Sequence, residues 1–159
     1  MKYRIISVGK IREPFYRDGI NEYLKRLGGY TNIELVDGLE EKLNPRAGEK
    51  EIARVLQKEG EKVLNLVGDN EILVILDIQG KSLSSENLAA QIGEWNLTGK
   101  SRVNLVIGGS YGVADAVKKQ ANNKISFSRM TFPHQMAVLI LTEQIYRGYK
   151  ILKGEPYHK

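Results

Sequence analysis

Two apolar stretches decide the fold of this chain: Glu71–Asp77 (EILVILD) and Arg102–Ile107 (RVNLVI). Both consist almost without interruption of leucine and β-branched residues. Strands that are buried on both faces have this composition, as in a parallel sheet covered by helices. The two stretches therefore predict the centre of a mostly parallel sheet with helices on its faces.

Outward from this centre, strand-like and helix-like segments alternate along the chain. We expect further strands at Lys2–Val8, Ile33–Val36 and Lys124–Phe127. Apolar residues at helical spacing predict helices at Glu13–Leu27, Glu49–Leu66, Ser84–Trp95 and Pro133–Leu152. This alternation indicates an α/β fold. No linker or low-complexity stretch divides the chain, so residues 1–159 are expected to form a single domain.

The composition excludes several classes of function. With no cysteine and two histidines, disulfides, thiolate catalysis and most zinc sites are ruled out, and no metal is expected. There is no run of eighteen apolar residues, and the start lacks the apolar stretch of a signal peptide. We therefore expect a cytoplasmic protein with no membrane partner.

The net charge of +5 is concentrated in the last quarter of the chain. Residues 1–117 carry 16 Lys and Arg against 17 Asp and Glu, whereas residues 118–159 carry eight against two. A basic end on a neutral body favours a polyanionic partner, because each phosphate contact releases counterions. A solvated cationic helix face accounts for the same charge equally well.

Three predicted strand ends carry unusual residues, at Leu76–Gly80, Ile107–Gly112 and Phe127–Phe132. Ligands of open α/β sheets bind beyond the carboxyl ends of the strands. Glycine lets the backbone approach a ligand closely, so a side chain at Gly108 is expected to fill space left open for that ligand. The alternatives are a structural turn for the glycines and core packing for Phe127–Phe132.

The helix expected at Pro133–Leu152 has apolar residues over more of its circumference than one stripe. Such a helix is buried on two sides, either in a large core or against another subunit, and in this short chain we favour a homodimer interface. Within it, Glu143 and Arg147 stand four residues apart. They form either an ordinary helix ion pair or a pair in which Glu143 orients Arg147 toward a phosphate or a nucleobase at the subunit boundary.

The blocks LDIQGK, IGGSYG, FSRMTFPHQ and LTEQIYRGYKI, followed by a terminal PYH, occur in this order. Through them the whole chain resembles the RlmH family of SPOUT-class methyltransferases, which methylate N3 of a pseudouridine in 23S ribosomal RNA. The resemblance implies a C-terminal trefoil knot and S-adenosylmethionine as the methyl donor. It also implies a homodimer with a shared active site, acting on ribosomal RNA in the large subunit or the assembled ribosome.

The resemblance assigns site residues as well. A cofactor pocket would be lined by Leu76, Gly108, Phe127, Ser128, Arg129, Met130, Thr131 and Phe132. For catalysis we expect His158 as a base, Tyr157 stacked on or hydrogen-bonded to the uracil ring, and Arg147 stabilising charge on O2 or O4. Composition alone would instead favour a frayed terminus for Tyr157 and His158. His134 is expected to be structural, serving the helix N-terminus or a neighbouring loop.

Two other classes of function compete with this hypothesis. A Rossmann-type oxidoreductase would carry G-x-G-x-x-G after the first strand, where a lone Gly9 stands. It would bind NAD and not S-adenosylmethionine. A non-catalytic RNA-binding protein would show salt-sensitive binding to RNA without methyl transfer.

Overall fold

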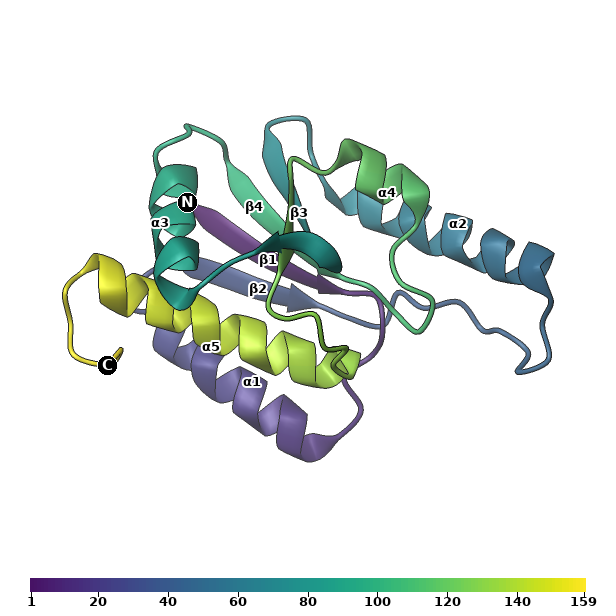
Figure 1. Cartoon of the computed structure of the whole chain (residues 1–159), viewed down its shortest axis with the longest axis horizontal. Coiled ribbons are helices and arrows are strands. Elements are labelled where there is room, and N and C mark those ends of the chain that lie inside the picture. Colours follow the sequence, from purple (N-terminus) through teal and green to yellow (C-terminus); the bar gives the residue numbers. More distant parts are fainter.

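The computed structural model describes residues 1–159 and has a five-stranded sheet with helices on both faces (Figure 1). The strands are β1 (Lys2–Ser7), β2 (Asn32–Val36), β3 (Glu71–Ser82), β4 (Arg102–Ile107) and β5 (Asn123–Ser126). The helices are α1 (Pro14–Leu27), α2 (Glu49–Leu66), α3 (Ser85–Asn96), α4 (Asp115–Gln120) and α5 (His134–Leu152). All strands and helices predicted from the sequence are present, with ends displaced by one residue in most cases.

The strand order is β2-β1-β4-β3-β5, and every neighbouring pair is parallel. The two stretches that decided the fold, β3 and β4, lie next to each other inside the sheet. Their central residues are buried on both faces. The predicted parallel sheet is therefore confirmed.

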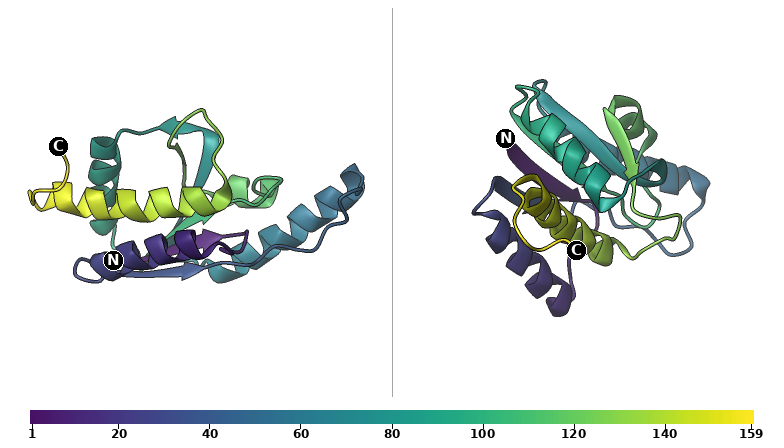
Figure 2. Two further views of the ribbon diagram at one scale, coloured as in Figure 1. Left: turned by 90° about the horizontal axis from the view of Figure 1, so that it is seen from below. Right: turned by 60° about the vertical axis from the view of Figure 1, so that its left-hand side comes forward.

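The two faces of the sheet carry separate cores, because side chains alternate along each strand. Ile5 and Leu105 belong to the larger core, under α1, α3 and α5. Ile6 and Val106 belong to the smaller core, under α2 and α4. Figure 2 shows α1 and α5 side by side along the larger core. Apolar burial between the sheet and these helices is the main stabilising contribution to the fold.

Strand β3 is longer than predicted: it continues past Asp77 to Ser82. Its pairing with β5 changes register between Leu76 and Lys81. A Cβ atom on Gly80 would lie 2.8 Å from the backbone of Ile125. Only glycine allows the two strands to approach so closely at this irregularity.

Helix α4 was missed from the sequence. It has six residues, of which only Val117 is buried. A single apolar position cannot produce the helical periodicity on which sequence-based prediction depends. Helix α4 matters for function, because it brings Lys118 to the pocket described below.

Helix α5 packs against α3 and α1, and its buried residues include Val138, Leu141, Ile145 and Tyr149. Contact with two helices and the sheet accounts for most of its apolar circumference within one chain. Met136 and Leu152 remain exposed. The homodimer therefore stays a prediction. None of the helices combines the length and the apolar character needed to cross a membrane.

Candidate functional site

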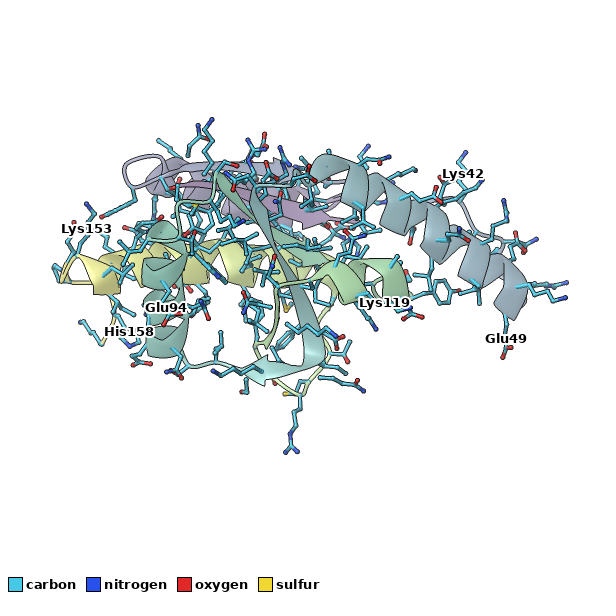
Figure 3. All side chains as sticks on the ribbon, turned by 90° about the horizontal axis from the view of Figure 1, so that it is seen from above. Lys42, Glu49, Glu94, Lys119, Lys153 and His158 are labelled. Atoms are coloured by element: carbon cyan, nitrogen blue, oxygen red, sulfur yellow. The ribbon has the colours of Figure 1, made fainter.

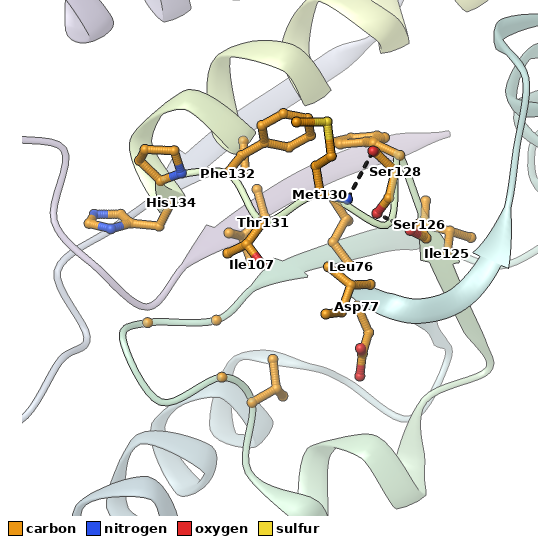
Figure 4. Close-up of a pocket in the computed structure, with 18 of the residues that line it drawn as sticks. Leu76, Asp77, Ile107, Ile125, Ser126, Ser128, Met130, Thr131, Phe132 and His134 are labelled. Atoms are coloured by element: carbon orange, nitrogen blue, oxygen red, sulfur yellow. Dashed lines mark hydrogen bonds between the residues drawn. The ribbon is translucent and has the colours of Figure 1, made fainter.

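A cavity of about 490 Å³ lies beyond the carboxyl ends of β3, β4 and β5 (Figure 4). We call it the strand-end pocket. Leu76 and Asp77 enter it from β3, Ile107 from β4, and the segment after Ser126 from β5. The carboxyl ends of parallel strands meet at one edge of the sheet, so three segments far apart in the sequence form one site.

Seven of the eight expected cofactor-binding residues line this pocket: Leu76, Gly108, Phe127, Ser128, Met130, Thr131 and Phe132. The eighth, Arg129, is exposed and is not among the lining residues. Its side chain is therefore available to solvent or to a polyanion, whereas its neighbours on both sides face the cavity.

The glycine turn has a different role from the one expected at Gly108. A Cβ atom there would lie 2.6 Å from the backbone carbonyl oxygen of Gly112, so the space beside Gly108 is filled by the chain itself. The expectation of open space at this position was wrong. Gly108 instead lets the turn fold back on itself, and the amide of Gly112 donates a hydrogen bond to the carbonyl of Gly109 at 3.1 Å.

The segment after β5 is held in shape by its own hydroxyl groups. The Ser126 hydroxyl donates to the carbonyl of Ser128 at 2.9 Å, and the Ser128 hydroxyl accepts from the amide of Met130 at 3.0 Å (Figure 4). Phe127 packs against the larger core, whereas Met130 is 71% exposed. Core packing thus explains one end of the segment and leaves an apolar side chain at the pocket.

Two charged pocket residues were not among the expected cofactor-binding residues. The Nζ atom of Lys118 in α4 lies 3.8 Å from Oδ2 of Asp77, and both side chains line the cavity. Asp77 lies in the strand end Leu76–Gly80 that the sequence already indicated as a place for a ligand. Lys118 could not be placed without α4.

His134 also lines the pocket, at the start of α5. Its Nε2 atom lies 3.1 Å from the carbonyl oxygen of Lys10, in the loop after β1. A carbonyl oxygen only accepts, so this ring nitrogen carries a proton. The expected structural role toward a neighbouring loop is consistent with this contact.

The three expected catalytic residues lie together at the other end of α5. We call Glu86, Glu143, Arg147, Tyr157 and His158 the C-terminal cluster. Nη2 of Arg147 lies 2.6 Å from Oε1 of Glu143, and the Tyr157 hydroxyl donates to the same oxygen at 2.9 Å. The arginine guanidinium is 4.7 Å from the centre of the Tyr157 ring. Glu143 and Arg147 therefore form more than an isolated helix ion pair.

The chain terminus is docked and not frayed. The Tyr157 ring packs edge-on against Tyr146, with ring centres 4.9 Å apart. Oε2 of Glu155 lies 2.7 Å from Nζ of Lys150 and also accepts a hydrogen bond from the Tyr30 hydroxyl. Contacts from α5 and from the loop between α1 and β2 thus hold the last residues in place.

Arg147 and Tyr157 in the cluster both keep their protons near neutral pH. The hydrogen bond to Glu143 raises the pKa of Arg147, so the guanidinium stays charged. Burial raises the pKa of Tyr157, and its neighbours Tyr23 and Glu143 raise it further. The phenol is therefore a proton donor near neutral pH and cannot serve as a base.

Within one chain, the strand-end pocket and the C-terminal cluster are separate. His134 begins α5 at the pocket, and Arg147 follows thirteen residues later in the same helix. At 1.5 Å per residue this corresponds to about 20 Å. Figure 3 shows His158 toward one end of the molecule, with Lys119 and Glu49 toward the other. A single chain does not bring the expected cofactor-binding and catalytic residues into one site.

Comparisons with known proteins give a consistent result. The family described as "Predicted SPOUT methyltransferase" matches residues 1–158. The ribosomal RNA large subunit methyltransferase H of Syntrophomonas wolfei is 64% identical over 159 residues, covering all of both chains. The protein of the same name from Enterococcus faecalis is 46% identical over the same length, again covering both chains fully.

A solved structure, a probable methylase family protein from Haemophilus influenzae, shares the fold with a TM-score of 0.54. It is 11% identical, and the match covers 99% of this chain and 70% of that one. With the parallel sheet, this likeness confirms the predicted fold class, and the family implies the trefoil knot. The chain belongs to the SPOUT methyltransferase family, among relatives called ribosomal RNA large subunit methyltransferase H.

Proposed function

We propose that this protein transfers a methyl group from S-adenosylmethionine to N3 of a pseudouridine in 23S ribosomal RNA. In this proposal residues 1–159 are one cytoplasmic SPOUT domain that works as a homodimer and needs no metal. The observation that carries it is the pairing of a ligand-sized pocket at the strand ends with a docked, preorganised catalytic cluster. Family membership supports the class of reaction, and the names of the relatives support the ribosomal substrate.

The strand-end pocket fits an adenosine-containing cofactor. Its volume of about 490 Å³ lies in the usual range for small-molecule sites. Leu76, Ile125 and Phe127 supply apolar walls that suit a purine ring. The backbone of the turn at Gly108–Gly112 supplies hydrogen-bonding groups. When bound, the sulfonium supplies an activated methyl group, so the protein has mainly to align donor and acceptor and exclude water.

The C-terminal cluster fits the needs of the acceptor. The N3 imide must lose its proton around the time of transfer, which leaves negative charge on the adjacent ring oxygens. Arg147, held charged by Glu143, stabilises that charge. Tyr157 donates a hydrogen bond to the ring or stacks on it, and His158 takes the proton.

A homodimer would close the gap between the two regions. If the C-terminal cluster of one subunit faced the strand-end pocket of its partner, donor and acceptor would meet at the subunit boundary. The exposed Met130 and Met136 are apolar side chains of the kind that such an interface covers.

The function is tested by incubating the protein with labelled S-adenosylmethionine and assembled ribosomes, large subunits or naked 23S RNA, and mapping the modified base. We expect methylation at N3 of a pseudouridine. Tight binding of NAD without affinity for S-adenosylmethionine would point to the oxidoreductase instead. Salt-sensitive RNA binding without transfer would point to the non-catalytic RNA-binding protein.

Subunit complementation tests the shared site. Gly108→Val damages the pocket and His158→Ala the cluster, so each variant alone is expected to be inactive. In a mixed dimer, one intact pocket and one intact cluster lie on different subunits, so one of the two shared sites is active. Random pairing makes about half of the dimers mixed, so roughly a quarter of wild-type activity should return. Mixed dimers that form but stay inactive would show that each subunit uses its own cluster.

A further inference from the structure

The His158 ring is hydrogen-bonded on both of its nitrogen atoms. Nδ1 lies 3.1 Å from Nη1 of Arg147, and Nε2 lies 2.8 Å from Oε1 of Glu86. Glu86 comes from the first turn of α3, 72 residues away in the sequence. No sequence motif indicated Glu86, yet it makes the shorter of the two hydrogen bonds to the proposed base.

These two partners determine where the ring proton sits. An arginine guanidinium has donors and no acceptor, so Nδ1 must accept and carries no proton in the neutral ring. The single ring proton then lies on Nε2, where it is donated to the carboxylate of Glu86. Both contacts require the same tautomer.

Glu86 is well placed to hold this orientation. A carboxylate in the first turn of a helix is stabilised by the helix dipole. The hydrogen bond from His158 lowers the pKa of Glu86, which keeps it ionised near neutral pH. The start of α3 is itself anchored, because Ser84 and Asn87 form a capping box and Ser85 donates to Gln144 of α5 at 2.7 Å.

We propose that Glu86 is a positioning residue for methyl transfer, which holds His158 with its proton on Nε2 and so makes Nδ1 the proton acceptor. The proposal rests on the function proposed above. In the structure Nδ1 is covered by Arg147. When Arg147 turns toward an oxygen of the uracil ring, the lone pair of Nδ1 becomes free to accept a proton.

The proton balance is then complete. The N3 proton passes to Nδ1 of His158, and the electron pair left on N3 forms the new bond to the methyl carbon as the carbon–sulfur bond breaks toward sulfur. The proton on Nε2 of the imidazolium stays hydrogen-bonded to Glu86. The negative charge of Glu86 stabilises the imidazolium, as a carboxylate does in a hydrolase triad. By binding the uracil ring, Arg147 thus uncovers Nδ1 of His158, which then accepts the proton.

Few other charged groups lie near the imidazole ring of His158. Arg147 and Glu143 approach from α5, Glu86 from α3, and Tyr157 and Lys159 adjoin it in the chain. The oxygen of Glu143 that faces the cluster is already engaged by Arg147 and Tyr157. Glu86 is the carboxylate hydrogen-bonded to the imidazole, so its replacement isolates the proposed effect.

Nitrogen NMR of the imidazoles tests the tautomer directly, since the chain has only two histidines and a His158→Asn variant assigns the signals. For neutral His158 we expect a protonated Nε2 and an unprotonated Nδ1. Glu86→Gln keeps an acceptor and preserves this tautomer, whereas Glu86→Ala mixes the two tautomers. Glu94→Ala is the matched control, because Glu94 is on the same helix and its side chain accepts a hydrogen bond from Gln91 and not from His158.

A split between kcat and KM tests the role in catalysis. Glu86→Ala should lower the single-turnover rate of methyl transfer several-fold, whereas KM for the ribosomal substrate should stay near its wild-type value, because Glu86 contacts His158 and does not line the strand-end pocket. Glu86→Gln keeps an acceptor for Nε2 and should retain more of the rate than Glu86→Ala. Glu94→Ala should leave both quantities unchanged.

Two results would overturn the proposal: a proton on Nδ1 of neutral His158 in the wild type, or a rate of methyl transfer that Glu86→Ala does not lower. If the wild-type protein transferred no methyl group, the proposed function would fall. The tautomer measurement would then still decide whether Glu86 orients the ring, so the two failures can be told apart.

Discussion

The strand-end pocket and the C-terminal cluster, at opposite ends of α5, are built in different ways. The pocket is walled by apolar side chains and backbone turns, with Asp77 and Lys118 as its charged pair. In the cluster, Arg147, Tyr157 and His158 all have hydrogen-bond partners. The difference shows how two tasks are divided. Holding a ligand requires space and close backbone approach, whereas moving a proton requires side chains whose donors and acceptors are already oriented.

The largest effects are expected in the cluster. Arg147→Ala and His158→Ala should lower the rate of methyl transfer by about 100-fold or more, the usual contribution of an acid–base or charge-stabilising group. Affinity for S-adenosylmethionine should stay near the wild-type value, because neither residue lines the pocket. Single-turnover rates and calorimetry measure the two quantities.

Lys153→Ala is the control, since it removes a nearby positive charge without touching the cluster. Normal turnover in either test variant would remove that residue from the mechanism. A parallel loss of cofactor affinity would show that the two regions are not independent.

An intermediate effect is expected in the pocket. Gly108→Ala places a Cβ atom 2.6 Å from the Gly112 carbonyl oxygen and must deform the turn, at a cost of about 1–3 kcal/mol for such overpacking. We expect weaker binding of S-adenosylmethionine and a lower Tm, and Gly108→Val should be more severe. Gly109→Ala, whose Cβ would meet Val8 at an ordinary 3.5 Å, is the matched control. Full affinity in Gly108→Val would contradict this account of the turn.

The smallest effect is expected at the edge of the cluster, where Glu155 anchors the terminus. Hydrogen bonds from Lys150 and then Tyr30 lower the pKa of Glu155 below its ordinary value of 4.5. A lowered pKa means that the anchor is fully present above pH 4.5 and is lost as the pH falls through the folded-state value. The protection of the amides of residues 153–158 against hydrogen exchange, measured relative to an unfolded chain at the same pH, should therefore fall in acid.

In Glu155→Gln the protection of this segment should be lower at neutral pH and should change less with acidification. Methyl transfer should fall only a few-fold, because Tyr157 and His158 keep their own contacts. Equal pH dependence in the variant and the wild type would assign the acid effect to another group, such as Glu86.

The pattern of residues was sufficient for the sheet, for four of the five helices and for the three strand ends that form the pocket. These features follow from local rules: buried strands have apolar runs, helices have a periodicity, and the carboxyl ends of parallel strands share an edge. The residues expected in the cofactor pocket and in catalysis came from the resemblance to a family, and their roles remain predictions.

Contacts between residues far apart in the chain left no recognisable pattern in the sequence. α4 has one buried apolar residue, Gly108 touches its own turn and not open space, and Glu86 is an ordinary exposed carboxylate of a first helical turn. Glu86 acquires a specific partner because α5 and the terminus fold back onto α3. Proximity between residues so far apart in the chain depends on how the helices pack on the sheet, which the local order of amino acids does not encode.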